Sequence, residues 1–235
     1  MRNYISNQKM KGNYHPITNF FSDAINIFSQ WGFNIVEGPE IDIEKYNFDL
    51  LRIPPLHPAR DMQDTFWIDD THLLRTQTSN VQVRAMEQSD PPARLISPGR
   101  VYRHEATDAT HLPFFHQLEG FAIDRGITIE HLMGTLTEFA KTYFDTNIKM
   151  RFRPSYFPFV EPGMEMDIYW NGRWMEILGC GMIHREVIGN MGIIDKSITG
   201  FAFGIGVERM IMAKYSISDM RKLYSNDYRL LKQIQ

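Results

Sequence analysis

The stretch GRVYRHEATDATHLPFFHQLEG, at residues 99–120, decides how this chain folds. It holds an Arg and a Glu two residues apart, then a polar loop, then a His, a Phe and a Glu at intervals of four. Because residues two or four apart project from the same face of a strand, the spacing predicts two strands joined by a loop. The surface that these strands share would carry Arg103, Glu105, Phe115, Gln117 and Glu119.

Side chains of these kinds suit ATP. A guanidinium binds phosphate, an aromatic face stacks on adenine, and a carboxylate accepts a hydrogen bond from an exocyclic amine. The Arg-x-Glu pair alone is more often an ordinary hairpin with scattered surface charges, since short motifs match by chance. The full spacing, which includes His111, is far harder to obtain by accident.

The complete pattern resembles motif 2 of the class II aminoacyl-tRNA synthetases. Within it, the segments ATH and FHQLEG narrow the resemblance to the catalytic α subunits of bacterial-type phenylalanyl-tRNA synthetases. The resemblance implies an α+β fold in which an antiparallel sheet is flanked by helices. It also implies a ligase that joins phenylalanine to ATP as phenylalanyl-adenylate, releases pyrophosphate, and transfers the amino acid to the 2′-hydroxyl of the terminal adenosine of tRNA(Phe).

Composition limits the alternatives. The chain has 235 residues, enough for one sizeable core, and its formal net charge is −3, so any contact with tRNA must be local or made by a partner. The lone Cys180 excludes an intramolecular disulfide and fits a reducing compartment. No stretch approaches the roughly 18 apolar residues of a membrane span, which favours a cytoplasmic protein. We expect a flexible leader at residues 1–13 and one catalytic domain at residues 14–235.

An amphipathic helix is predicted to begin at Pro16, with a stripe of apolar residues that continues to Trp31. Residues 33–41 then read as a strand, in which Pro39 suggests an edge or an interface position. A helix and a strand of this kind occur in many α+β folds. Beside the opening pattern they resemble motif 1 of the class II enzymes, which implies the subunit interface.

The segment LLRTQTS, at residues 73–79, is predicted to be a strand that ends at a helix N-terminus. Thr78 or Ser79 would cap the following helix, the ordinary role of such hydroxyls. In the resembled family this loop lines the amino-acid site, so Gln77 and Ser79 are also candidate substrate contacts. Upstream, the loop HPARDM contains potential ligands, although a His among prolines is more often a surface residue. These are His57, Arg60 and Asp61.

Two aromatic residues in the segment YFPFVEP are candidates for the amino-acid pocket. Phe157 and Phe159 point the same way because they are two residues apart, and such a pair can meet a third ring edge-to-face. The resemblance makes that third ring the substrate phenylalanine. Alternating aromatic residues are otherwise usual in a core.

Glu176 lies in a predicted strand among apolar neighbours, after a hairpin signal at Asn171 and Gly172. A carboxylate in such a place needs a partner. A neighbouring Arg would be the plain structural solution. By analogy with class II enzymes, the partner is a Mg²⁺ ion that bridges the phosphates of ATP, and this interpretation is preferred.

The segment GFAFGIGVER, at residues 200–209, is predicted to be a glycine-punctuated strand that runs into a helix. It matches motif 3 of the class II enzymes, where Arg209 would lie over adenine or reach the γ-phosphate. Ala202 would face the pocket and leave room for a phenyl ring. Upstream, the segment MIHREVI departs from the family's usual MVHPNVL directly after His184, which leaves the role of that histidine open.

The resemblance assigns a role to each candidate residue. Arg103 would stabilise the α-phosphate, His111 and Arg209 would hold the leaving pyrophosphate, and Glu176 would hold Mg²⁺. Adenine would lie between Glu105 and Phe115. The substrate ammonium would be held by Ser79, Gln117 and Glu119, with Gln77 as a further substrate contact. The residues around its ring would be Phe157, Phe159 and Ala202.

The expected partners also follow from the resemblance. The family's α subunits work with a large β subunit in an (αβ)₂ assembly and bind tRNA(Phe). They ordinarily carry an N-terminal helical hairpin that reaches tRNA, whereas here only a short leader is expected before the catalytic domain. We therefore expect a trimmed α subunit, a naturally reduced α subunit, or an amino-acid-activating paralogue that passes its adenylate to an acceptor other than tRNA. A catalytically dead regulatory or assembly module is a third hypothesis, against which the intact motif residues argue.

Overall fold

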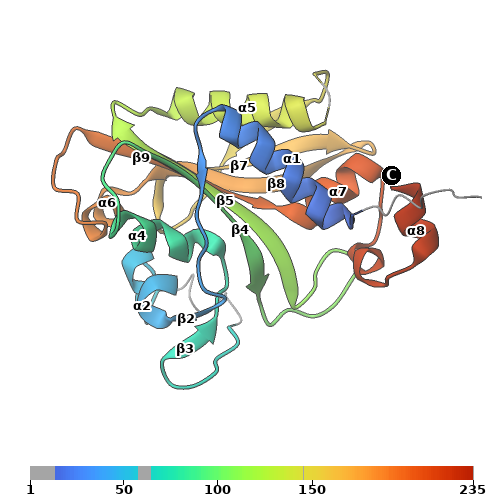
Figure 1. Cartoon of the computed structure of the whole chain (residues 1–235), viewed down its shortest axis with the longest axis horizontal. Coiled ribbons are helices and arrows are strands. Elements are labelled where there is room, and N and C mark those ends of the chain that lie inside the picture. Colours follow the sequence, from blue (N-terminus) through green and yellow to red (C-terminus); the bar gives the residue numbers. More distant parts are fainter. Residues whose placement is uncertain (1–13, 58–64, 145, 235) are drawn as a thin grey trace, which may run out of the picture.

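A seven-stranded sheet organises the computed structural model, which describes residues 14–57, 65–144 and 146–234 (Figure 1). The strand order is β1-β4-β5-β9-β8-β7-β6. The bounds are β1 Asn34–Ile35, β4 Ala93–Tyr102, β5 Phe114–Arg125, β6 Met150–Pro154, β7 Val160–Trp170, β8 Arg173–Ile183 and β9 Ile198–Gly206. The expected leader at residues 1–13 and the potential ligands Arg60 and Asp61 lie outside the described residues.

Helices cover both faces of the sheet, which confirms the expected α+β class (Figure 1). One face carries α1 (Pro16–Gln30), α5 (Ile129–Tyr143) and α7 (Val207–Tyr215). The other side carries α2 (Glu44–Asn47), α4 (Val81–Met86), α6 (Arg185–Asn190) and a small sheet of β2 (Ile41–Ile43) and β3 (His72–Leu74). Further elements are the 3-10 helices η1 (Asp49–Leu51), η2 (Thr78–Asn80) and η3 (Met220–Tyr224), and the helix α8 (Tyr228–Gln233).

One edge of the main sheet differs from the expectation. β1 pairs with β4 in parallel and over only two residues, whereas the other neighbouring pairs are antiparallel, so the sheet is mixed. The strand predicted at residues 33–41 is therefore mostly absent. Pro39 has no N–H to donate to a ladder, and the carbonyls of Gly38 and Pro39 accept hydrogen bonds from the guanidinium of Arg75 instead.

The larger core lies between the sheet and the three helices α1, α5 and α7. Phe28 of α1 stacks on Phe139 of α5, with 4.8 Å between ring centroids, and on Phe203 of β9, with 5.3 Å. All three rings are buried. α1 begins at Pro16, as predicted. The apolar stripe of this helix therefore packs on the back of the sheet and leaves the opposite face for the site.

The hairpin between β7 and β8 confirms a local signal. Asn171 and Gly172 connect the two strands with positive φ angles of 46° and 79°, as an Asn-Gly turn requires. The turn sets the register that brings Glu176 opposite Asp167 on β7. No helix in the described part of the chain has both the length and the apolar character needed to cross a membrane.

Candidate active site

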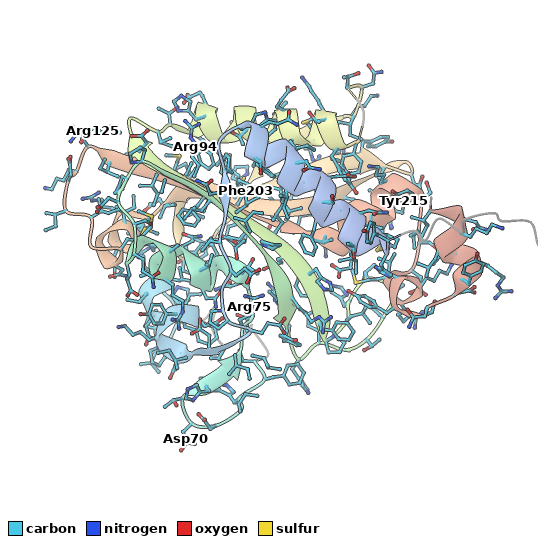
Figure 2. All side chains as sticks on the ribbon, viewed as in Figure 1. Asp70, Arg75, Arg94, Arg125, Phe203 and Tyr215 are labelled. Atoms are coloured by element: carbon cyan, nitrogen blue, oxygen red, sulfur yellow. The ribbon has the colours of Figure 1, made fainter. Side chains whose placement is uncertain are left out.

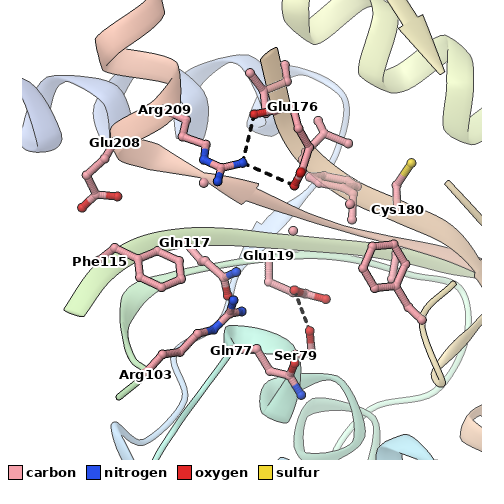
Figure 3. A pocket seen from close by; sticks show the side chains of 18 of the residues that line it. Gln77, Ser79, Arg103, Phe115, Gln117, Glu119, Glu176, Cys180, Glu208 and Arg209 are labelled. Carbon is pink, nitrogen blue, oxygen red and sulfur yellow. Dashed lines mark hydrogen bonds and ion pairs between the residues drawn. The ribbon is translucent and has the colours of Figure 1, made fainter. Parts of the chain in front are cut away.

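A cavity of about 520 Å³ opens on the sheet face opposite to α1 and α5, and the first turn of α7 also contributes to its lining (Figure 3). Alternation along β5 decides which side chains reach it, because Phe115, Gln117 and Glu119 line the cavity while Leu118 and Ala122 pack in the larger core. Every predicted site residue lines this cavity. They are Gln77, Ser79, Arg103, Glu105, His111, Phe115, Gln117, Glu119, Phe157, Phe159, Glu176, Ala202 and Arg209.

Arg103 and Glu105 reach the cavity from a loop and not from a strand, so that part of the prediction is wrong. β4 ends at Tyr102, and the N–H of Arg103 donates to the carbonyl of Pro113 at 3.0 Å. The N–H of Glu105 then donates to the carbonyl of Arg103 at 2.8 Å, which is a tight turn. The turn breaks the extended backbone on which the alternation of side chains depends.

Two guanidinium groups face one part of the cavity (Figure 3). The Arg103 guanidinium carbon lies 5.1 Å from the centroid of the Phe115 ring, and Nε of Arg103 donates to the carbonyl of Thr76 at 3.1 Å. Burial lowers the pKa of Arg103, and the charge of Arg209 acts in the same direction. A bound polyanion would offset both effects, so this part of the cavity suits phosphate groups.

Glu176 is paired with an arginine. Nη1 of Arg209 lies 3.5 Å from Oε1 of Glu176 and donates to the Glu176 backbone carbonyl at 3.3 Å. Among the described residues, no group of three or more His, Cys, Asp and Glu side chains is placed to hold a metal ion. A single carboxylate still fits Mg²⁺, which proteins often bind through one or two carboxylates together with substrate phosphates. Of the upstream potential ligands, His57 is described, and its Nε2 lies 3.3 Å from the hydroxyl of Tyr156.

His111 lines the cavity from the loop that follows β4, where a local turn holds it. The carboxylate of Asp108 accepts hydrogen bonds from the N–H of Thr110 at 2.6 Å and of His111 at 2.8 Å. These bonds, together with the ring of His111, hold the pKa of Asp108 well below its usual range. Oδ1 of Asp108 lies 3.1 Å from Nδ1 of His111, so this contact orients the imidazole ring.

A buried carboxylate occupies another part of the cavity. Glu119 is only 2% exposed, and it accepts hydrogen bonds from Oγ of Ser79 at 2.9 Å and from Nε2 of Gln82 at 2.6 Å. Burial raises the pKa of Glu119 to about 7, although both hydrogen bonds act in the opposite direction. A bound cation would favour the ionised form. This carboxylate therefore suits an ammonium group.

The hydroxyl of Ser79 does not cap α4, although a cap by Thr78 or Ser79 was predicted. α4 begins at Val81, after η2, and Asn80 occupies its N-cap position without a side-chain cap hydrogen bond. The predicted cap by Thr78 or Ser79 is wrong, because Ser79 donates to Glu119 on β5 instead. Gln82 was not predicted as a site residue. Its spacing of three from Ser79 is the available signal, since residues three apart share one side of a helical turn.

An apolar pocket continues from this carboxylate. The rings of Phe157 and Phe159 lie 5.9 Å apart and both line the cavity. Ala202 lies on β9 two residues from Gly204, which is the register partner of Glu119. Burial raises the pKa of Cys180, another lining residue, to about 12, so its thiol is neutral. The arrangement fits a molecule that joins an ammonium group to an apolar ring.

The residues that depart from the family pattern lie outside the cavity. His184 occupies the N-cap of α6 and accepts a hydrogen bond from the N–H of Glu186 at 3.1 Å. Glu186 forms an ion pair with Arg52 at 2.9 Å. Arg185 donates to backbone carbonyls of the segment that follows α6. The departure therefore concerns a helix end and its neighbours, and the cavity lining is unchanged by it.

Comparison with known proteins agrees with this geometry. The family model of the tRNA synthetases class II core domain (F) matches residues 3–234, almost the whole chain. The fold is accordingly that of the class II tRNA synthetases.

Several similar proteins are phenylalanine-tRNA ligase alpha subunits. Those of Edwardsiella ictaluri and Pectobacterium carotovorum subsp. carotovorum are each 50% identical to this chain over 225 residues, which is 95% of this chain and 68% of theirs. That of Prochlorococcus marinus subsp. pastoris is 50% identical over 224 residues, or 95% of this chain and 67% of its own. The chain belongs to the family of phenylalanine-tRNA ligase alpha subunits, a family of aminoacyl-tRNA ligases, as the motifs predicted.

Proposed function

We propose that this chain activates L-phenylalanine with ATP to phenylalanyl-adenylate and transfers the amino acid to the 2′-hydroxyl of the terminal adenosine of tRNA(Phe). One observation carries the proposal, namely that a single cavity joins a guanidinium pair to a buried carboxylate beside an apolar pocket. The guanidinium groups of Arg103 and Arg209 suit ATP, and Glu119 with its aromatic neighbours suits the amino acid. The names of the relatives indicate which amino acid and which tRNA.

In the first step the carboxylate of phenylalanine attacks the α-phosphorus of ATP, and pyrophosphate leaves. Negative charge develops on the oxygens of the α-phosphate, where Arg103 stabilises it. His111 and Arg209 hold the departing pyrophosphate. In the second step the 2′-hydroxyl oxygen attacks the carbonyl carbon of the adenylate, its proton is released to solvent, and AMP leaves with the electron pair of the broken bond. Catalysis comes from positioning and charge stabilisation, with no covalent intermediate on the enzyme.

Binding roles divide the cavity between the two substrates. Phe115 stacks on adenine, and Glu105 accepts a hydrogen bond from its exocyclic amine. Glu119 pairs with the ammonium of phenylalanine, helped by Ser79, and the ring lies in the apolar pocket. The other proposed contacts to phenylalanine are Gln77, Gln117, Phe157, Phe159 and Ala202.

Mg²⁺ is the proposed metal ion, and it would neutralise charge on the phosphates of ATP. Glu176 would hold it. The carboxylate is 42% exposed and its ion pair with Arg209 spans 3.5 Å, so ATP and the ion could take over both partners without leaving a buried charge unpaired. Chelation of Mg²⁺ should stop exchange, and Glu176→Gln should raise the Mg²⁺ concentration that gives half-maximal exchange.

A β subunit is the proposed partner, in an (αβ)₂ assembly in the cytoplasm, because the relatives are named alpha subunits. The N-terminal segment that resembles motif 1 is the proposed interface. Ile35 and Ile41 in this segment are about half exposed, at 50% and 53%, and would be buried by a partner. Expressed alone, the chain should be poorly soluble or inactive. A stable preparation of this chain that fully charges tRNA by itself would contradict the partner proposal.

The deciding experiment measures two activities on the chain co-expressed with a β subunit. Phenylalanine-dependent exchange of pyrophosphate into ATP tests activation, and attachment of labelled phenylalanine to tRNA(Phe) tests transfer. Exchange and charging together would support the proposal. Exchange without charging of tRNA(Phe) would identify a paralogue with another acceptor, and absence of both activities from the folded complex would refute the enzyme assignment.

A further inference from the structure

Glu208 is a second buried carboxylate in the cavity lining, and no step of the proposed reaction uses it (Figure 3). It precedes Arg209 in the first turn of α7 and is 1% exposed. Its two oxygens accept hydrogen bonds from the backbone N–H of His116 at 2.9 and 3.0 Å. Oε1 also lies 2.8 Å from Nδ1 of His116 and accepts a short hydrogen bond from the hydroxyl of Tyr224. Both oxygens of the carboxylate are therefore hydrogen-bonded to protein groups.

These contacts fix the backbone of β5 next to Phe115, a residue of the proposed ATP site. His116 stands between Phe115 and Gln117, which both point into the cavity. The ring of His116 points to the opposite face, where Phe21 of α1 packs on it with 6.0 Å between centroids. Because neighbouring strand residues share one backbone, a shift at His116 would move the Phe115 ring. Glu208 therefore acts on the cavity through β5.

Tyr224 is the last residue of η3, and its hydrogen bond to Glu208 connects this segment to β5. Its ring packs edge-on against Phe114, with 5.0 Å between centroids. Four residues earlier, the N–H of Met220 donates to the carbonyl of Ala109 at 2.8 Å, in the loop that carries His111. Thus η3 holds the cavity at two points, one on the loop and one on β5 through Glu208.

We propose that Glu208 and Tyr224 are positioning residues for ATP, which hold Phe115 and the His111 loop in the geometry that binds adenine and phosphates. The proposal rests on the assignment of ATP to this part of the cavity. It predicts an effect on ATP and not on phenylalanine, because the proposed phenylalanine contacts on β5 have other partners. Glu119 is held by Ser79 and Gln82, and Oε1 of Gln117 accepts a hydrogen bond from the N–H of Thr78 at 3.2 Å.

The variant Tyr224→Phe tests the proposal, since it removes one hydroxyl and keeps the ring. In phenylalanine-dependent pyrophosphate exchange by the αβ complex, the KM for ATP is expected to rise about five- to tenfold, as for the loss of a hydrogen bond of ordinary net strength. The KM for phenylalanine should stay within twofold. Tyr215→Phe is the matched control, because Tyr215 is half-buried on α7 and does not line the cavity, and it should leave both values unchanged.

If the Tyr224 hydroxyl only stabilised the fold, Tyr224→Phe would have a lower unfolding temperature and unchanged KM values for ATP and phenylalanine. That result would overturn the proposal. An equal rise of both KM values would also overturn it. Glu208→Gln provides a second variant, which should raise the KM for ATP by itself and show less than additive effects with Tyr224→Phe, because both act through one contact. Additive effects would contradict a shared route.

Measuring the affinity for ATP directly distinguishes a failure of the positioning role from a failure of the proposed reaction. If the wild-type complex shows no exchange, calorimetric titration with ATP and Mg²⁺ replaces the kinetics. Weaker ATP binding by Tyr224→Phe than by wild type would then support the positioning role while the proposed reaction fails. Equal binding, or no binding by the wild type, would overturn the positioning role.

Discussion

Oγ of Ser79 donates a hydrogen bond to Oε2 of Glu119 at 2.9 Å, although forty residues separate the two in the chain. This bond and that from Gln82 lower the pKa of Glu119, but burial has the larger effect and raises it to about 7. The charge of Glu119 therefore changes around neutral pH. Figure 2 shows the described side chains of the whole molecule, with Phe203 near its middle and Arg125 at its periphery.

The affinity for phenylalanine is expected to depend on pH through Glu119. Only the ionised carboxylate pairs with the substrate ammonium, so the KM for phenylalanine should rise about tenfold as the pH falls from about 8 to about 6. Glu119→Gln should raise this KM and flatten its pH profile. The measurement is pyrophosphate exchange across that range, with the KM for ATP as the control. A flat wild-type profile would remove Glu119 from ammonium binding.

Stability should change with pH through the same residue. The folded-state pKa of Glu119 lies above the ordinary value of 4.5, so between these values the folded state binds more protons than the unfolded state. Stability from this group is therefore greatest below pH 4.5 and falls as the pH rises through about 7. Urea unfolding should show a shallower fall for Glu119→Gln than for wild type. Identical slopes would contradict the raised pKa.

Arg103→Ala is expected to abolish most of the exchange activity. Donors that stabilise developing oxyanion charge contribute on the order of 2.7–4 kcal/mol, or about 10²–10³ in kcat. Arg125→Ala is the control, because Arg125 forms an exposed ion pair with Asp195 and does not line the cavity. Exchange near the wild-type level in a folded Arg103→Ala variant would remove Arg103 from the mechanism.

Ala202 is expected to set the size of the amino-acid pocket. Ala202→Gly should admit p-chlorophenylalanine, whereas Ala202→Val should fill the space and weaken phenylalanine itself. An unpaired buried hydroxyl costs about 1–3 kcal/mol, so wild type should reject tyrosine only roughly ten- to a few-hundredfold at activation. Exchange kinetics with the three amino acids give the answer. If Ala202→Gly still excludes the chloro analogue, Ala202 does not border the ring.

Gly99→Ala should destabilise the fold through Arg75. A Cβ atom at Gly99 would lie 1.9 Å from Nη2 of Arg75, whose guanidinium is buried and donates to the carbonyls of Gly38 and Arg100. Overpacking of this kind costs about 1–3 kcal/mol in the free energy of unfolding. Gly134→Ala is the control, because nothing lies within 4 Å of its added Cβ in α5, and it should raise stability by about 0.5–1 kcal/mol. Denaturant titration compares the two, and equal stabilities would contradict the steric argument.

The sequence alone predicted the features that depend on residues close together along the chain. Alternation along β5 predicted that Phe115, Gln117 and Glu119 share one face, because that periodicity is a property of the strand backbone. The start of α1 at Pro16 and the Asn171-Gly172 turn depend in the same way on local dihedral preferences. The motifs that suit ATP were recognised for the same reason, since their spacing is local.

Only the tertiary structure decided which groups pair with these side chains. A hydroxyl before a helix is expected to cap it, yet Ser79 donates to a buried carboxylate that the fold brings within reach. Arg103 reaches the cavity from a turn because the pairing of β4 with β5 ends at Tyr102. Glu208 accepts a hydrogen bond from Tyr224, which lies sixteen residues further along the chain. Hydrogen bonds form at about 3 Å in space, and a pattern along the chain does not contain the distances between residues that folding brings together.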